Sequence, residues 1–331
     1  MIITKTPYRM SFFGGGTDYP TWFMKNEGRV LSATINKYCY ITCRSLPPFF
    51  DHDIRVAWSR VENLTNIDDI QHPAVREGLR FMGIKRGISI THEGDLPART
   101  GLGSSSSFMV GLLHALYAYQ GRMADKMTLA TEAIHVEREM IKDNVGCQDQ
   151  IAASVGGLNK ISFSSQGYTV SPLVLSSETL ETLEKHLMMF YTGIARTASE
   201  VVAEQLKTMN DKQKEMHQVL ALVDKAESLL LSGDIPSFGR LLDETWKLKR
   251  SLSMKISNSY IDDAYALGIK AGAYGGKLLG AGGGGFLLFL CPPEKQASMK
   301  KALKDFLHVP VRFEFNGTQI IHYVPDNYET F

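Results

Sequence analysis

The chain has 331 residues, of which 44% are apolar and 21% charged, enough to bury a large core in one or two packed domains. Its 36 lysines and arginines nearly balance 35 acidic residues, which argues against a nucleic-acid-binding protein. The apolar runs are shorter than the roughly 20 residues of a membrane span, and the N-terminus lacks the core of a secretory signal. Four cysteines without metal-binding spacing fit a reducing cytoplasm. We therefore expect a cytoplasmic protein without nucleic-acid or membrane partners.

The first half of the sequence mixes predicted strands and helices. Runs rich in Ile, Val, Tyr and Thr with a period of two predict strands at 1–4, 28–43, 54–59 and 87–93. Apolar residues at helical spacing predict helices at 68–82, 104–120, 126–141 and 148–154. Gly83 is expected to end the first helix, and Gly156 and Gly157 precede a hairpin at 158–174.

The second half is richer in predicted helix. A strand at 188–192 comes before long helical patterns at 198–209 extending to 231, 235–252 and 259–271. After a further strand and a glycine-rich turn, we expect a strand at 286–291, a helix at 294–306 and strands at 309–315 and 318–324. This is an α+β chain, and the higher content of predicted helix in its second half suggests two domains, 1–180 and 181–331.

The densest motif is Pro97-Ala-Arg-Thr-Gly101-Leu102-Gly103 followed by four serines, Ser104 to Ser107, at the start of a predicted helix. Glycines let the backbone approach a ligand, and a helix start offers free N–H groups and a positive dipole end, so the pattern predicts phosphate binding. The alternative is a serine N-cap on an ordinary helix. The motif lacks the Gly-Lys-Ser/Thr ending of a Walker A loop, the third glycine of a dinucleotide fingerprint and the spacing of a hydrolase elbow.

Two other segments are rich in glycine. Lys277-Leu-Leu-Gly280-Ala-Gly282-Gly283-Gly-Gly precedes an apolar strand, and so many glycines indicate a backbone packed against a ligand or another loop. Near the N-terminus stands Gly14-Gly-Gly16-Thr17-Asp18. Asp18 there is either a turn former or a ligand for hydroxyl groups, and taken alone the segment favours the turn.

In this order, these motifs resemble those of the GHMP kinase superfamily over essentially the whole chain. Pro7-Tyr-Arg9 is similar to the family's first motif, Pro97 to Ser107 to its second, and Lys277 to Gly285 to its third. The resemblance implies an N-terminal S5-like α/β domain, a C-terminal ferredoxin-like α+β domain, and ATP and Mg²⁺ as cofactors. It also implies a small-molecule acceptor with an alcohol group.

The Gly14–Asp18 segment and Asn144-Val-Gly-Cys147-Gln-Asp149-Gln look most like the sugar-1-kinase branch, in particular the D-glycero-D-manno-heptose 7-phosphate kinases. Galactokinases usually carry Gly-Glu-His-Thr-Asp where this chain has three glycines before Thr17 and Asp18. That departure puts galactose in doubt and leaves room for a larger acceptor. The branch therefore implies a sugar or sugar phosphate as substrate, with a homodimer left open.

The resemblance also assigns candidate site residues. Asp149 becomes the general base and Arg9 the basic residue beside it, although the two could instead form a purely structural ion pair. Ser105 and Glu137 become metal ligands, with Glu139 as the rival acid. The expected nucleotide contacts are Pro97, Gly101, Leu102, Gly103, Ser104, Ser105, Ser106, Ser107 and Gly282. The expected substrate contacts are Gly16, Thr17, Asp18 and Gly283.

A phosphate on the substrate would need a further cation, for which the sequence offers Arg99, Lys160, Arg196, Lys247 and Lys255 without choosing between them. Two rival functions stay open at this point. One is another sugar-1-kinase of the family, similar to fucokinase or galactokinase. The other is a catalytically dead sensor of nucleotide or sugar on the same fold, which would bind ligands without turnover.

Overall fold

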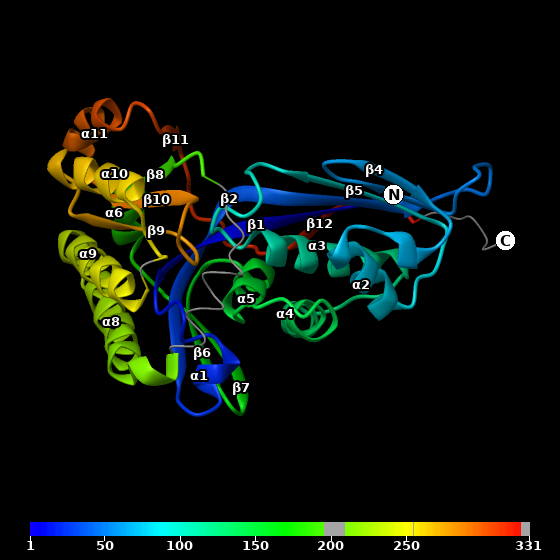
Figure 1. Ribbon diagram of the computed structural model, residues 1–331, viewed down its shortest axis with the longest axis horizontal. Coiled ribbons are helices and arrows are strands. Elements are labelled where there is room, and N and C mark those ends of the chain that lie inside the picture. Colours follow the sequence, from blue (N-terminus) through cyan, green and yellow to red (C-terminus); the bar gives the residue numbers. More distant parts are fainter. Residues whose placement is uncertain (195–208, 254, 326–331) are drawn as a thin grey trace.

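The structure, a computed structural model, describes residues 1–194, 209–253 and 255–325 (Figure 1). Two sheets organise it. In the larger sheet the strands run in the order β12-β1-β2-β5-β3-β4, and β6 pairs with β2 and β7. These strands are β1 (Ile2–Phe13), β2 (Gly28–Ser45), β3 (Ile54–Ala57), β4 (Val61–Leu64), β5 (Ile88–Gly94), β6 (Leu158–Ser164), β7 (Gly167–Pro172) and β12 (Gln319–Tyr323).

Helices cover one face of this larger sheet (Figure 1). They are α2 (Pro73–Met82), α3 (Ser104–Tyr119), α4 (Lys126–His135), which continues as a π-helical turn (Val136–Met140), and α5 (Gln148–Val155). The short α1 (Pro20–Phe23) follows the N-terminal glycines. Gly83 ends α2 in the left-handed conformation at φ 69°, as expected, but the helix begins at Pro73 rather than at 68.

The smaller sheet is antiparallel, in the order β11-β8-β10-β9. Its strands are β8 (Leu187–Tyr191), β9 (Gly275–Leu278), β10 (Phe286–Leu290) and β11 (Leu307–Val309). The helices of this half are α6 (Ser177–His186), α8 (Gln213–Leu231), α9 (Ile235–Leu252), α10 (Ser259–Lys270) and α11 (Gln296–Ala302). Numbered along the chain, the strand order is 4-1-3-2, that of a ferredoxin-like fold, which confirms the predicted fold class.

The sequence analysis missed one helix, extended one strand too far, and predicted one helix that cannot be compared with the structure. Helix α6 was not predicted. The expected strand at 309–315 is wrong beyond Val309, because this segment makes only one isolated bridge, from Phe313 to Ile35, where β2 passes from its partner β6 to its partner β5. The helix expected at 198–209 lies outside the described residues except for Met209, where a short 3-10 turn (Met209–Lys212) begins.

The two halves share buried side chains. One apolar cluster joins residues of β1, such as Met10 and Phe12, to Phe238 and Leu242 of α9. Strand β12, from the segment expected to belong to the second domain, pairs with β1 in the larger sheet. Strand β12 therefore belongs to the sheet of the first half, although it lies in the predicted second domain. For the rest of the chain, the domain boundary at residue 180 stays a prediction. Among the described helices, none has the length and apolar character to cross a membrane.

Candidate active site

Two glycine-rich loops meet at the site. A Cβ atom added to Gly280 would lie 2.3 Å from the Cα atom of Gly101, and one added to Gly285 would lie 2.2 Å from the carbonyl oxygen of Thr100. Both distances are shorter than real carbon contacts, so only glycine permits this packing. The 280–285 loop therefore packs against the serine-bearing loop before α3, one of the two uses expected for so many glycines.

Arg9 on β1 and Asp149 at the start of α5 form a two-pronged ion pair. The Nε and Nη2 atoms of Arg9 donate to the two Asp149 carboxylate oxygens at 2.7 and 2.8 Å, and Nη1 donates to the Gly101 carbonyl oxygen at 2.7 Å. The Arg9 side chain is 6% exposed and that of Asp149 is 23% exposed. The pair thus ties the catalytic candidates to the serine-bearing loop and leaves the carboxylate open to a ligand.

Gly103, the last residue before α3, brings that loop beside Asp149. Its φ is 71°, and an added Cβ atom would lie 3.1 Å from Asp149 Oδ2 and 3.3 Å from Arg9 Cγ. The N-terminus of α3, where backbone N–H groups are free to bind an anion, therefore begins directly beside the carboxylate.

Glu137 lies in the π-helical turn after α4 and is 3% exposed. Its Oε2 atom accepts a hydrogen bond from Ser106 Oγ at 2.8 Å and one from Gln150 Nε2 at 2.5 Å. Burial raises the pKa of Glu137 to about 7, with Asp149 adding to the rise and these two hydrogen bonds opposing it. Ser105, the expected partner of Glu137, is instead exposed at the helix start.

The residues around Glu137 fit a magnesium ion. A carboxylate and a serine hydroxyl are hard oxygen donors of the kind that Mg²⁺ binds. The amide oxygen of Gln150 is buried beside them without a hydrogen-bond partner among the described residues. A buried oxygen without a partner is rare because it costs free energy, so we expect an ion or a water molecule to bind it. Ser106 and Glu137 would then hold the metal, with Ser106 in place of the predicted Ser105.

Asp18 closes the N-terminal glycine turn and joins it to α5. Its carboxylate accepts from the backbone N–H groups of Gly16 at 3.0 Å and Gln148 at 3.3 Å, and it is 1% exposed. Burial, together with the charge of Asp149, raises its pKa. This is the turn-forming role that the segment alone favours, while contact between Asp18 and a sugar stays a prediction.

Several other candidates point away from a ligand. Thr17 is fully buried, and its hydroxyl bonds with the backbone of Gly14 and Arg29, so it secures the turn rather than a substrate. The Ser107 hydroxyl donates to the Pro7 carbonyl oxygen at 2.9 Å inside the protein, which corrects its expected nucleotide contact. The Gly283 N–H donates to the Ile256 carbonyl oxygen, so it is not free for a substrate.

The remaining nucleotide candidates divide by exposure. Ser104 is half-buried beside Ser105, and its hydroxyl accepts from the N–H of Arg99 at 3.2 Å. Pro97 is exposed at the start of the loop, whereas Leu102 as a whole residue is 1% exposed and belongs to the core. Its carbonyl oxygen accepts from the N–H of Arg9 at 3.1 Å. Gly282, at φ 122°, is packed against Ile256.

Sequence reasoning missed two lysines. Lys249 on α9 donates to the Gly280 carbonyl oxygen, and its pKa is lowered to about 8 by burial and by the charge of Arg9, with Asp18 opposing. Lys277 on β9 donates to the carbonyl oxygens of Ser11 and Phe12, each at 2.9 Å, and so connects the two sheets. Nothing in the local pattern of α9 distinguishes Lys249 from its neighbour Lys247.

Two of the cations expected to clamp a substrate phosphate are engaged in ion pairs, while Arg99, Arg196 and Lys255 stay predictions. Lys160 pairs with Glu227 at 2.6 Å, and Lys247 pairs with Asp243 at 2.6 Å. Arg99 is exposed on the serine-bearing loop with φ 63°. Arg196 lies outside the described residues. Lys249, by contrast, is a buried lysine whose charge interacts with the charges of Arg9 and Asp18.

Comparison with known proteins agrees with this geometry. Residues 70–157 match the GHMP kinases N terminal domain, and residues 226–309 match the GHMP kinases C terminal domain. The first match contains the serine-bearing loop, Glu137 and Asp149, and the second contains the 280–285 loop.

Similar proteins cover nearly the whole chain. The D-glycero-alpha-D-manno-heptose 7-phosphate kinase of Campylobacter jejuni is 29% identical over 92% of this chain and 93% of its own length. A galactokinase of Pyrococcus furiosus is 25% identical over 92% and 94%. The solved D-glycero-D-manno-heptose 1-phosphate kinase from Bacteriodes thetaiotaomicron has a TM-score of 0.80 at 23% identity, over 97% and 99% of the two chains. The chain belongs to the GHMP kinase superfamily and is a phosphotransferase with a hydroxyl group as acceptor.

Proposed function

We propose that this protein is an ATP-dependent kinase that transfers the γ-phosphoryl group to the anomeric hydroxyl of a sugar phosphate. D-glycero-D-manno-heptose 7-phosphate is the proposed acceptor, and the product is its 1,7-bisphosphate for nucleotide-heptose synthesis. The observation that carries the proposal is the contact of Gly103 with Asp149, since it joins an anion-binding helix start to a carboxylate within reach of solvent. The similarity to a heptose 7-phosphate kinase supports the choice of acceptor.

Phosphoryl transfer asks the protein mainly for alignment and charge neutralisation. The exposed start of α3, with Ser104 and Ser105, would hold the nucleotide phosphates through its free N–H groups. Asp149 would accept the proton of the acceptor hydroxyl, and Arg9 and Lys249 would offset the negative charge on the transferring group. Mg²⁺, when bound by Ser106 and Glu137, would shield the charge of the phosphates.

The acceptor would enter beside the N-terminal glycine turn. Gly15 and Gly16 stand where galactokinases carry Glu and His, so these two positions contribute no side chain to the site. Both are half-buried, whereas Asp18 behind them is enclosed. We place the reaction in the cytoplasm, which the four buried free thiols support.

An assay of the purified protein with Mg·ATP tests this function. Heptose 7-phosphate, galactose, fucose and mannose are compared, and the phosphorylated position is assigned by phosphorus NMR. We expect turnover with the heptose phosphate at its anomeric position. Turnover with galactose or fucose alone would instead establish another sugar-1-kinase, and binding of ATP without turnover on any sugar would indicate a sensor.

Asp149→Asn separates a base from a structural ion pair. If Asp149 is the base, kcat of the folded variant falls at least 100-fold, the size of effect typical of general base catalysis, while ATP affinity stays close to wild type. If the pair is purely structural, the folded variant keeps most of its kcat and only the melting temperature falls, because buried Arg9 loses its full charge partner under either reading. The matched control is Asp224→Asn, which removes an ion pair to Arg29 near the surface.

A further inference from the structure

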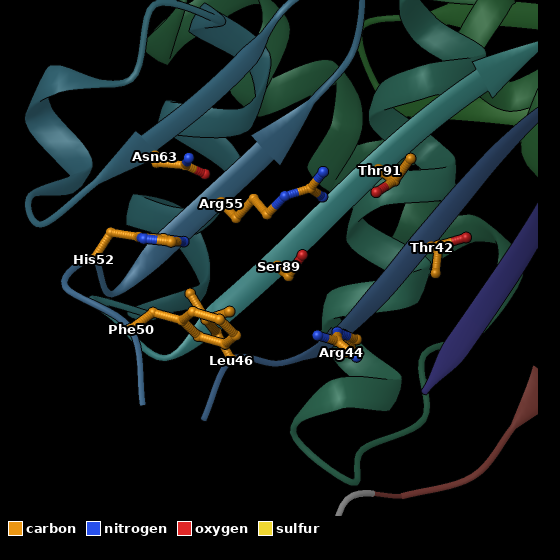
Figure 2. Close-up of a pocket in the computed structure, with 9 residues that line it drawn as sticks. All are labelled: Thr42, Arg44, Leu46, Phe50, His52, Arg55, Asn63, Ser89 and Thr91. Atoms are coloured by element: carbon orange, nitrogen blue, oxygen red, sulfur yellow. The ribbon is translucent and has the colours of Figure 1, made fainter. Parts of the chain in front are cut away.

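A second polar site lies on the larger sheet, lined by none of the residues discussed above. The register places Arg44 of β2 opposite Ser89 of β5, Ser89 opposite Arg55 of β3, and Arg55 opposite Asn63 of β4. Four polar side chains thus form one row across four strands (Figure 2). Strands lie about 4.8 Å apart, so the Cα atoms of the two arginines are separated by about 10 Å and both guanidinium groups can reach one ligand.

This row faces away from the helices. Its residues alternate along the strands with Cys43, Ile54, Ile88 and Ile90, which are buried in the core that contains α2 and α3 side chains. Side chains of a strand alternate between faces, so the arginines lie on the opposite, open face of the sheet. There the row forms the floor of a pocket of about 300 Å³.

The pocket carries an uncompensated positive charge. The guanidinium groups of Arg44 and Arg55 have no ion pair or hydrogen bond to another residue in the described parts of the chain, and the nearby Asp51 contacts His52 at 3.5 Å instead. A concave surface with two cations and no paired acid attracts anions. Two guanidinium groups on either side of a serine hydroxyl match the several oxygens of a phosphate.

One end of the pocket is apolar. Leu46 and Phe50 lie together there, and Phe50 is 51% exposed with its ring centroid 5.5 Å from that of His52 (Figure 2). An exposed aromatic ring beside two arginines offers a surface for a ligand ring. The volume is at the lower end of the roughly 300–1,000 Å³ of ligand pockets, which suits a small metabolite rather than a dinucleotide.

We propose that this pocket binds a small phosphate monoester, with its phosphate between Arg44 and Arg55 and its ring against Phe50. Isothermal titration calorimetry with phenyl phosphate, inorganic phosphate and phenol tests the proposal. Phenyl phosphate should bind at least tenfold more tightly than either of the other two. Arg44→Gln and Arg55→Gln should each weaken it tenfold or more, and Phe50→Ala should remove its advantage over inorganic phosphate.

The control is Arg122→Gln, which removes an exposed arginine of equal charge on another part of the surface and should leave phenyl phosphate binding unchanged. Equal binding by the control and both pocket variants would overturn the proposal. So would the same affinity for phenyl phosphate and phenol. Phenyl phosphate bound at the serine-bearing loop would not be mistaken for phenyl phosphate in this pocket, because Arg44→Gln and Arg55→Gln would not weaken binding at that loop. The test is therefore independent of the proposed kinase function.

Discussion

Glu137 is an acid that the fold keeps almost entirely out of water, and this gives stability a particular pH dependence. Its pKa is raised from an ordinary 4.5 to about 7, mainly by burial. Between these values the folded chain holds a proton that the unfolded chain releases. The stability gained from the protonated acid is therefore present below about pH 4.5 and is lost as the pH rises through 7.

Glu137→Gln removes this titration while retaining a side chain of similar shape. From pH 4.5 to 8, wild type should lose up to about 3 kcal/mol of unfolding free energy that the variant keeps, at 1.36 kcal/mol per pKa unit. Urea unfolding of both proteins at intervals of one pH unit measures the difference. A difference that does not change with pH would show that folding does not shift the pKa of Glu137.

Lys249 gives a second residue-level prediction, in the pH dependence of activity. With a pKa of about 8, it loses its charge in mildly alkaline solution, so kcat/KM should fall above pH 8 if this cation offsets charge on the transferring group. Lys249→Met should lower kcat/KM at least tenfold at pH 7. Lys249→Arg, which stays charged, should retain more activity and move the alkaline decline upward. An unchanged decline in Lys249→Arg would assign it to another group.

At the scale of elements, local signals predicted helices well. Helix α9 begins at Ile235, directly after Asp234, whose carboxylate accepts from the N–H of Ser237, and Pro236 suits its first turn. The segment at 309–315 shows the limit of such signals. Its alternating apolar residues favour a strand, but the available edge of β2 there is only the short gap between β6 and β5. Whether the segment can pair with β2 therefore depends on how much of that strand β5 and β6 already occupy, which the segment's own residues do not show.

The contact between the two glycine-rich loops predicts unequal effects of alanine. Gly280→Ala would combine a positive φ of 77° with a Cβ atom 2.3 Å from Gly101 Cα. Gly121→Ala has a similar φ of 65° but nothing within 4 Å, so it isolates the backbone cost of about 1–2 kcal/mol. We expect Gly280→Ala to destabilise more and to weaken ATP binding, measured by chemical denaturation and calorimetry. Equal losses in the two variants would mean that the loops separate freely.

At the scale of the whole molecule, the site depends on segments far apart in sequence. Arg9 and Asp149 are separated by 140 positions, and only the resemblance to a family brought them together before the structure. Lys249 was missed because its charge becomes relevant only where α9 packs against the 280–285 loop. The sequence also did not show that Ser106, rather than Ser105, contacts Glu137, since the phase of α3 decides which serine faces that acid.

The shared core predicts that both halves unfold together. Phe238 of α9 is fully buried, and its ring contacts those of Phe12 and Phe13 of β1 at centroid distances of 5.7 and 5.2 Å. Calorimetry of wild type should therefore show one transition. Phe238→Ala should cost about 3–5 kcal/mol and separate the transition into two, because it removes the ring contacts with Phe12 and Phe13 that join α9 to β1.

Phe163→Ala is the matched control for this coupling. Phe163 is 1% exposed, and its aromatic contacts are with Phe23 and Tyr168 of the first half, while Met216 of α8 belongs to the same apolar cluster. It should lower the melting temperature without separating the transition. Trp246 gives a fluorescence signal for the second half once Trp22 and Trp58 are replaced by Phe, and Trp22 gives one for the first half once Trp58 and Trp246 are replaced. Coincident signals in Phe238→Ala would show that β12 and Lys277 are enough to keep the two halves cooperative, since both join the second half to β1.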